Sequence, residues 1–249
     1  MKAKYKPIIG ILALVAMWQL VAWLNLFNPI YFASPIEVFT EAMKMINAGT
    51  IFTDIYFTLY RLLFSMFIAI IFGLPIGLLL GYFASIYRYF GEIVDFLRSI
   101  PPIVIYPLLL IILGPGDSSR IGVAVFGAVV VLILIISKGL FQQSPLRKQF
   151  FKAMGATRSQ ILKYIVWYEA LPHIMLALRT AVSLSLIIVV VTEMLVGARY
   201  GLGTRVQNVQ ITANIPDLFT TIIIIGLVGV LLNKILISLD RKFVFWKTN

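Results

Sequence analysis

The sequence contains no cysteine and a single histidine, His173. The lack of cysteine excludes disulfides and thiolate metal ligands, and one histidine argues against a histidine-built metal centre. Charged residues make up only 12% of the 249 residues and hydrophobic residues 61%, whereas soluble domains carry about 25% charged residues. A water-soluble fold cannot cover so much apolar surface, so the solvent around this chain is predicted to be lipid.

Acidic residues are also scarce, with 10 Asp and Glu against 21 Lys and Arg, and the formal net charge is +11. A strongly basic balance is one mark of nucleic-acid-binding proteins. Here the basic residues flank long apolar runs, which is typical of the ends of membrane segments. We therefore expect contact with membrane lipid and no nucleic-acid partner.

The long runs of few charges predict about six transmembrane helices, because a spanning helix needs roughly 20 apolar residues. The predicted spans cover about 8–27, 56–85, 99–114, 120–138, 172–197 and 218–239. The strands of a membrane barrel would be shorter and would alternate in polarity. The predicted fold class is therefore an all-α, multi-pass membrane protein, with residues 1–249 forming a single transmembrane domain of the cell membrane.

The distribution of Lys and Arg predicts the orientation of these spans. Thirteen basic residues fall in segments that would be cytoplasmic: Lys2, Lys4, Lys6, Arg88, Lys138, Arg147, Lys148, Lys152, Arg158, Lys163, Arg241, Lys242 and Lys247. Four fall in segments that would be outside: Lys44, Arg120, Arg199 and Arg205. Since cytoplasmic loops carry the excess of positive charge, we predict that both termini are cytoplasmic.

The first outside loop is predicted to hold a short helix over 35–48. Ser34 can cap it, Pro35 suits its first position, and Glu37 completes a capping box, while Gly49 can end it. Its apolar face indicates that it lies at the outer membrane interface. Two roles remain open for it: a connector that covers lipid-facing surface, or a landing site for an extracytoplasmic partner.

Small residues and prolines mark two further features of the spans. Gly73, Gly77 and Gly81 recur at every fourth position of the second span, a spacing that lets another helix approach closely. They are interpreted as helix-packing residues. Pro101 and Pro102 cannot lie inside a regular helix, so they are predicted to separate a short segment over 92–98 from the third span.

The longest predicted cytoplasmic segment, 139–171, reads as a helix, a glycine elbow and a second helix. The first helix covers 147–154, Gly155 fits its end, and Thr157 with Gln160 can cap the next helix. Apolar side chains stand there among basic ones, namely Phe150, Phe151 and Met154 among Arg147, Lys148, Lys152 and Arg158. Such a surface suits insertion into the groove of a partner protein or adsorption to anionic lipid, and the residues alone do not separate the two.

Glu193 is the most unusual residue of the predicted spans, because an intramembrane carboxylate is costly and faces protein or water. Arg179 lies fourteen residues before it, ~21 Å away along a helix, so pairing within one helix is excluded. Arg61 or Arg98 of another span can pair with it. A structural or gating pair is favoured over direct contact of Glu193 with substrate, and Glu193 with its neighbour Thr192 is assigned to the translocation pathway or its gate.

Two other polar residues of the spans have simpler interpretations. Arg179 lies roughly 10 Å inside the fifth span, and we expect it to extend back to the cytoplasmic surface. Tyr106, next to Pro107, is placed with the translocation pathway, although packing within a helix bundle explains it equally well.

Around the glycine elbow the sequence resembles the permease subunits of ABC importers. Their cytoplasmic loop has the form Glu-Ala-Ala, three residues, Gly, nine residues, Ile, one residue, Leu-Pro. Gly155 and Ile165 match, whereas Gln149, Phe150 and Phe151 replace Glu-Ala-Ala, and Trp167 and Tyr168 replace Leu-Pro. The run from Met154-Gly155-Ala156-Thr157-Arg158 through Ala170-Leu171-Pro172 is similar to the nitrate/sulfonate/taurine/bicarbonate branch, as are Ser34-Pro35, Arg98-Ser99-Ile100-Pro101-Pro102, Glu193-Met194-Leu195 and Gly201-Leu202-Gly203.

The resemblance implies a permease that moves a small solute inward by alternating access. It implies a homodimer or close heterodimer of such chains, two ATPase subunits on the cytoplasmic side, and an extracytoplasmic solute-binding protein. The family's coupling helix maps onto about 147–163. Its ATPase-coupling residues would be Gln149, Phe150, Phe151, Met154, Gly155, Ala156, Thr157, Arg158 and Ile165.

The sequence lacks the Gly-x-x-x-x-Gly-Lys-Ser/Thr loop that holds nucleotide phosphates. The chain itself is therefore not predicted to be an enzyme or to bind a cofactor or metal, and ATP with Mg²⁺ would be held by the partner subunits. An ion-gradient-driven secondary transporter or channel is the alternative, but such proteins often show internal repeats, and none is evident. An intramembrane enzyme is disfavoured because Glu92 and Asp95 stand at the interface without a histidine.

Overall fold

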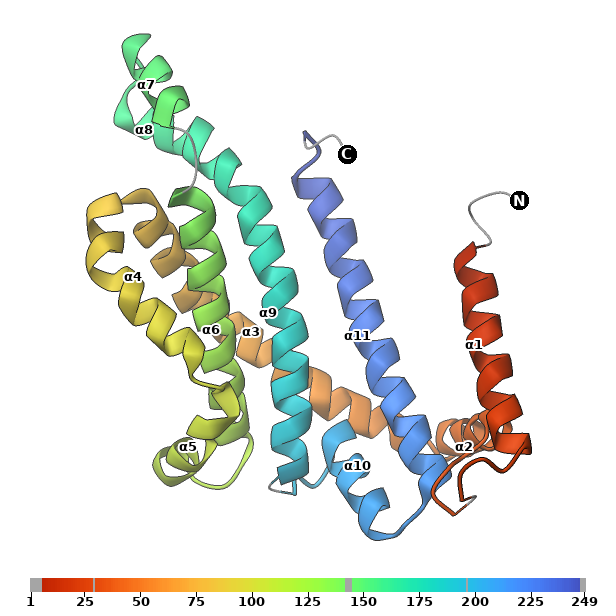
Figure 1. Cartoon of the computed structure of the whole chain (residues 1–249). Helices are drawn as coiled ribbons and strands as arrows, with labels where there is room; N and C mark the ends of the chain where they lie inside the picture. The colour runs from red at the N-terminus through yellow and green to blue at the C-terminus, as the bar shows by residue number, and fades with distance from the viewer. Residues whose placement is uncertain (1–5, 29, 142–144, 196, 247–249) are drawn as a thin grey trace.

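The computed structural model of the chain describes residues 6–28, 30–141, 145–195 and 197–246 (Figure 1). The side chains of Lys6, Pro7, Pro145, Lys148 and Arg158 lie outside this description, as do Lys2, Lys4 and Lys247 of the predicted cytoplasmic ends. All the regular structure in the described residues is helical. Helices satisfy their own backbone hydrogen bonds, which is what lipid demands of a spanning segment.

The helices, in chain order, are α1 (Lys6–Trp23), α2 (Pro35–Ala48), α3 (Thr50–Tyr82), α4 (Ala84–Ser99), α5 (Tyr106–Leu113), α6 (Asp117–Phe141), α7 (Pro145–Ala153), α8 (Arg158–Ile161), α9 (Trp167–Leu195), α10 (Leu202–Ile211) and α11 (Ile215–Phe243). A 3₁₀ turn, Pro102–Ile105, leads into α5, and a π-helical turn, Leu162–Val166, joins α8 to α9.

Four of the helical segments are long and apolar enough to cross a membrane: 50–82, 117–141, 159–195 and 215–243. Each contains most or all of a predicted span, and each extends beyond it at one or both ends. The apolar part of α1 is shorter, over 8–23. The fold class is confirmed as an all-α membrane protein, while the number of six spans stays a prediction.

The predicted third span differs from a straight helix over 99–114. Helix α4 reaches Ser99, the chain breaks at the two prolines, and α5 has only eight residues. The two parts are bent by 86°, as in a broken span or a re-entrant loop. The break follows from Pro101 and Pro102, which lack the donor N–H of a continuous helix. The helix before the break is 16 residues long rather than the predicted segment over 92–98.

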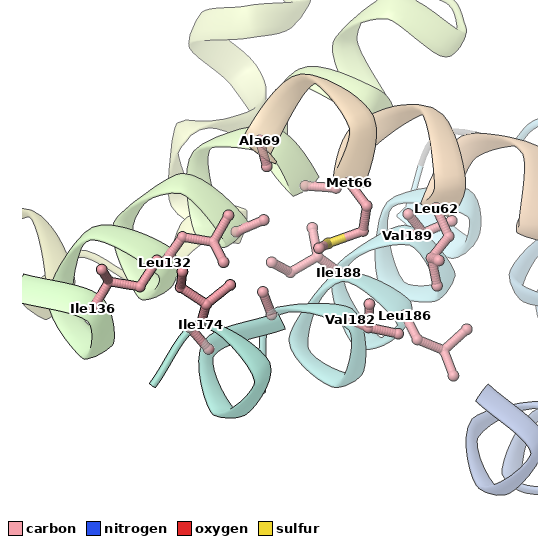
Figure 2. Close-up of a cluster of buried hydrophobic side chains, with 14 of the residues drawn as sticks. Leu62, Met66, Ala69, Leu132, Ile136, Ile174, Val182, Leu186, Ile188 and Val189 are labelled. Atoms are coloured by element: carbon pink, nitrogen blue, oxygen red, sulfur yellow. The ribbon is translucent and has the colours of Figure 1, made fainter. Parts of the chain in front are cut away.

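Helices α3, α6 and α9 form the centre of the fold, and α3 crosses the others at a slant (Figure 1). Their contact is a cluster of buried apolar side chains, among them Leu62 and Ala69 of α3, Leu132 and Ile136 of α6, and Val189 of α9 (Figure 2). All five are completely or almost completely buried. This cluster fixes the positions of the residues at both ends of α9.

The two ends of the molecule carry different elements (Figure 1). Helices α7 and α8, the start of α1 and the end of α11 lie at one end, whereas α2, α5 and α10 lie toward the other. Under the predicted orientation the first end is cytoplasmic and the second is the outer end, and these two names are used below.

Candidate functional site

Glu193 is the centre of a buried ionic network at the outer end of α9. Its carboxylate is fully buried and lies 2.6 Å from Nη1 of Arg61, from α3. The Thr58 hydroxyl lies 3.0 Å from both carboxylate oxygens, and the backbone N–H of Gly203 donates to Oε2 at 2.9 Å. Arg61 is thus the partner, one of the two candidates proposed from the sequence. Arg98, the other candidate, lies 3.7 Å from Asp95 instead.

Arg61 extends the network from α9 to α6. Its Nε donates to Oδ1 of Asp117, at the start of α6, at 2.8 Å, and its Nη1 also donates to the backbone carbonyl of Tyr200 at 2.9 Å. Asp117 in turn pairs with Arg120 at 3.1 Å. One guanidinium therefore ties α3, α6, α9 and the α9–α10 loop together. Because hydrogen-bonded charge pairs inside a protein are costly to break, this region is expected to stay assembled.

The α9–α10 loop is fitted closely around the Glu193 carboxylate. The N–H of Gly201 donates to Asp54 Oδ1 at 3.0 Å, and that of Leu202 donates to Thr58 Oγ1 at 2.9 Å. A Cβ added at Gly201 would lie 2.6 Å from the Glu193 carboxylate, and one at Gly203 would meet the backbone carbonyl of Val190. Glycine is therefore required at both positions by the close approach of the loop.

A second ionic cluster continues from this loop to α11. Arg205 of α10 binds Asp217 through Nε and Nη2, at 3.0 and 2.9 Å, and Asp54 through Nη1 at 3.2 Å. Burial alone would lower the pKa of Arg205, but the hydrogen bonds and charges of Asp217 and Asp54 outweigh it and raise that pKa. The outer ends of α3, α9, α10 and α11 are thus joined by adjacent charge clusters.

The three residues assigned to the pathway or gate are all buried in the single chain. Thr192 has no exposed surface, and its hydroxyl donates to the Val189 carbonyl at 2.9 Å. Tyr106 is only 4% exposed and packs in the apolar cluster. Its hydroxyl is buried without a hydrogen-bond partner among the described residues. Of the three, only Glu193 binds side chains of another spanning helix.

The three glycines assigned to helix packing line the contact between α3 and α6. A Cβ added at Gly73, Gly77 or Gly81 would lie 3.0, 3.1 or 2.7 Å from the Cβ of Leu132, Ile136 or Leu140, respectively. The missing side chains allow the two helices to approach this closely.

At the cytoplasmic end, α7, Gly155 and α8 form the elbow expected from the sequence. Gly155 has a φ of 85° in the left-handed region, which an L-residue with a side chain adopts only with strain. Thr157 and Gln160 form a reciprocal cap, with the N–H of Thr157 donating to Gln160 Oε1 at 2.8 Å and that of Gln160 donating to Thr157 Oγ1 at 3.3 Å. Through the π-helical turn, α8 continues into α9.

The elbow presents apolar side chains to its surroundings. Phe150 is 61% exposed, Phe151 40% and Met154 70%. Gln149, Gly155 and Thr157 are exposed as well, Ala156 is half-buried, and Ile165 is buried. A pocket of about 440 Å³ lies under the elbow, lined by Phe151, Met154, Gly155, Ala156, Gln160, Ile161, Tyr164 and Ile165.

An ion pair attaches the elbow to the base of α9. Nη1 of Arg147 lies 2.7 Å from Oε1 of Glu169. A separate contact joins the base of α9 to the end of α11, since the rings of Tyr168 of α9 and Trp246, just after α11, lie 5.2 Å apart. Helix α7 is therefore linked to α9 by an ion pair as well as by the chain itself.

The sequence predicted the Glu193–Arg61 pair as one option but missed the rest of the outer network. The signal in the sequence that indicates this network is a polar strip on α3. Asp54, Thr58, Arg61 and Ser65 recur at intervals of three and four residues and are all buried. In a helix this spacing places them on one face, and a buried polar face within an apolar helix indicates a polar network with other helices.

Among the described residues, no group of three or more His, Asp or Glu could hold a metal ion. The arrangement is that of an apolar helical core with a buried ionic network at one end and an exposed elbow at the other, which suits the membrane subunit of a transport protein. The chain belongs to the family of binding-protein-dependent transport system inner membrane components, whose model matches residues 69–246.

Two similar proteins are transport permeases, which is consistent with membership of this family. The chain is 28% identical to the taurine transport system permease protein TauC of Escherichia coli, with 96% of this chain and 88% of that protein covered. It is 25% identical to the nitrate import permease protein NrtB of Synechocystis, with 96% and 89% covered. The chain is thus a permease subunit of an ABC importer and a multi-pass protein of the cell membrane. The family is not itself catalytic.

Solved transporter structures share the fold. A chain of the MetNI methionine ABC transporter in an inward-facing conformation matches with a TM-score of 0.68 and 24% identity, covering 78% of this chain and 96% of that one. A chain of a bacterial ABC transporter that imports alginate matches with a TM-score of 0.61 and 15% identity, covering 97% and 90%.

Proposed function

We propose that two copies of this chain form the membrane pathway of the importer and that an ATPase subunit binds each copy at the elbow formed by α7, Gly155 and α8. The observation that carries this proposal is the exposed apolar tip of that elbow, Phe150 and Met154, held on a folded and capped turn. Apolar side chains with a basic rim are typical of a segment that enters a partner's groove.

The route from the ATPase to the pathway runs along α9. Closure of the two ATPase subunits would draw the two elbows together, and α9 would carry this movement toward the outer end. Packed helices respond to such a force by rotating as rigid bodies between discrete arrangements. The inward-facing state named for the methionine transporter would be one of these arrangements.

On the outer side, a solute-binding protein would deliver the solute to the outer ends of α2, α5 and α10. Helix α2 supports this role because it is fixed by its capping box, with the N–H of Ser34 donating to Glu37 Oε2 at 2.7 Å, and because Ile36 and Phe39 are exposed on it. ATP and Mg²⁺ would be bound in the partner subunits.

Adsorption of the elbow to anionic lipid is the second candidate for this surface. It predicts that the chain retains no ATPase and that charge, rather than the conformation of Gly155, controls the contact.

The test is co-purification of the tagged chain with the ATPase encoded nearest to it, in mild detergent, with ATP hydrolysis as the readout. Gly155→Val is expected to lose the ATPase, because a β-branched residue cannot adopt a φ of 85° without strain. Gly155→Asn is the matched control and should retain it, since asparagine tolerates the left-handed region. A native chain that retains no ATPase, or equal retention by Gly155→Val, would refute the proposal.

A further inference from the structure

A cavity lies at the cytoplasmic end of the molecule, between α7, the base of α9 and the segment that follows α11. Its volume is about 540 Å³, and it is lined by Arg147, Phe151, Tyr164, Ile165, Tyr168, Glu169, Pro172 and Trp246. The tip of the elbow, Phe150 and Met154, lies apart from these lining residues. The cavity is thus a separate surface from the one proposed to bind the ATPase.

The length of α9 places this cavity at the level of the lipid head groups. Helix α9 has 29 residues and is therefore about 43 Å long, whereas the hydrocarbon core of a bilayer is about 30 Å thick. Glu193, near the other end of α9, belongs to the outer network. Tyr168 and Glu169, in the first turn of α9, therefore lie beyond the hydrocarbon core, in the cytoplasmic head-group layer under the predicted orientation.

The aromatic side chains of the cavity are those of a membrane interface. Tyr164, Tyr168 and Trp246 line it, and all three are exposed. Tyr and Trp are enriched at head-group level because each joins an apolar ring to a hydrogen-bond donor. Toward the membrane centre, Leu176 lies two turns beyond Glu169 on the same face of α9 and is exposed. Polar donors therefore stand beside an apolar surface, as an amphiphilic ligand requires.

Two cations suit the cavity to an anionic ligand. Nη1 of Arg147 lies 2.7 Å from Oε1 of Glu169, and because a guanidinium has five N–H donors, Arg147 can bind a second acceptor while this ion pair persists. Lys163 is exposed, and its Nζ lies 5.2 Å from the centre of the Tyr164 ring. Glu169 offsets one of these two positive charges, so a net positive charge remains at the cavity.

We propose that this cavity, named here the head-group pocket, binds the phosphate of an anionic phospholipid of the cytoplasmic leaflet. Basic pockets between transmembrane helices on the cytoplasmic side bind anionic head groups, and phosphate accepts charge-assisted hydrogen bonds from a guanidinium. The bound lipid contacts α7 through Arg147, α9 through Tyr168 and the segment after α11 through Trp246, and so holds the elbow against α9. This inference goes beyond the proposed function and does not depend on it.

The test is a titration of the delipidated chain in detergent with dioctanoyl phosphatidylglycerol, read by native mass spectrometry. One lipid is expected to bind per chain. Its affinity should exceed that of zwitterionic dioctanoyl phosphatidylcholine about tenfold, the effect of two basic residues near a head group. The compound sn-glycerol 3-phosphate carries a phosphate without acyl chains, and at equal concentration it should not displace the lipid.

Two pairs of variants test which side chains bind the lipid. Arg147→Gln should lower the affinity about tenfold, the loss expected for a hydrogen bond to a charged group. Glu169→Gln is its control, because it breaks the same ion pair but retains the arginine, and it should not lower the affinity. Trp246→Leu should weaken binding as well, whereas Trp23→Leu, which changes an exposed tryptophan at the outer end of α1, should not.

Equal affinity for the two lipids, or an Arg147→Gln variant that binds as the native chain does, would overturn the inference. Equal losses in Arg147→Gln and Glu169→Gln would show that the ion pair only supports the elbow. Displacement by sn-glycerol 3-phosphate would assign the pocket to a soluble phosphate compound instead.

The native titration is then repeated with the ATPase bound. The lipid should stay bound, and its release by the ATPase would show that the pocket belongs to the surface that the ATPase covers. A chain that retains no ATPase but still binds the anionic lipid selectively would contradict the proposed function and leave the head-group pocket intact, so the two failures are distinguishable.

Discussion

The two ends of α9 are built in opposite ways. At the outer end, Glu193 is fully buried, paired with Arg61 at 2.6 Å, and enclosed by a glycine loop that leaves no room for a side chain. At the cytoplasmic end, the elbow exposes Phe150 and Met154 and is attached to α9 by the exposed Arg147 and its partner Glu169. The comparison indicates that the outer end holds the helices in place, whereas the cytoplasmic end presents an exposed surface to a partner.

The largest expected effect comes from removing one member of the buried pair. Glu193→Gln leaves Arg61 with a weakened partner in a buried site, and breaking such a pair costs about 3–5 kcal/mol. We expect a strong loss of thermal stability in detergent, measured by size-exclusion chromatography after heating. Glu41→Gln, which breaks the exposed Lys44–Glu41 pair at 2.9 Å, should change little. Equal stability of Glu193→Gln and the native chain would show that the network does not hold the outer end.

A methyl group at Gly203 should have the next largest effect. Its Cβ would meet the Val190 carbonyl and lie 2.7 Å from the Glu193 Cβ, so the loop must move, at a cost of about 1–3 kcal/mol or more. Gly226→Ala is the control, since no atom lies within 4 Å of a Cβ there. The thermal stabilities of Gly203→Ala and Gly226→Ala test this expectation. A similar stability of both variants would contradict the close fit of the loop around Glu193.

A smaller effect is expected at the cap of α2. Ser34→Ala removes the side-chain acceptor of the Glu37 N–H and should cost about 1 kcal/mol. Ser34→Thr retains a capping oxygen and should be nearly neutral. Hydrogen exchange of the first turn of α2 measures the difference directly, and faster exchange in Ser34→Thr than in Ser34→Ala would contradict the capping role.

The smallest effect on stability is expected at the elbow, although its functional effect is large. Met154 is 70% exposed, and substitutions at such surface positions change stability by about 0.5 kcal/mol or less. Met154→Asp should therefore keep the melting temperature and lose the ATPase on co-purification. Lys152→Gln, on the same segment, tests whether charge alone explains the binding. Retention of the ATPase by Met154→Asp would show that the apolar tip is not part of the interface with the ATPase.

Local signals in the sequence predicted those parts of the fold that depend on neighbouring residues. Helix α2 begins and ends where Ser34, Glu37 and Gly49 place it, because caps act within one turn. The elbow at Gly155 follows from the same kind of signal. The lengths of α4 and α5 were not predicted, since α4 is an amphipathic helix whose Val94 packs with Leu80 and Ile133, and such long-range packing leaves no mark next to the prolines.

The candidate site was predicted to the extent that it depends on single unusual residues. Glu193 is noticeable as a carboxylate in an apolar run, and its partner was narrowed to two arginines. The choice of Arg61 depends on the crossing of α3 and α9, and the contribution of Asp117 and Gly203 depends on where α6 and the loop end. These arrangements arise from tertiary packing, which the sequence of one chain shows only indirectly, through the polar strip on α3.

The most direct test of the account compares movement at the two ends of α9 in the complex with its ATPase. Spin labels on Ser159→Cys of the two copies report the elbow, and labels on Tyr56→Cys and Asn208→Cys of one copy report the contact between α3 and α10 at the outer end. On trapping with ATP and vanadate, the account predicts that the distance between the two elbows shortens while the outer distance stays unchanged. An unchanged elbow distance, or an outer distance that changes with it, would contradict the account.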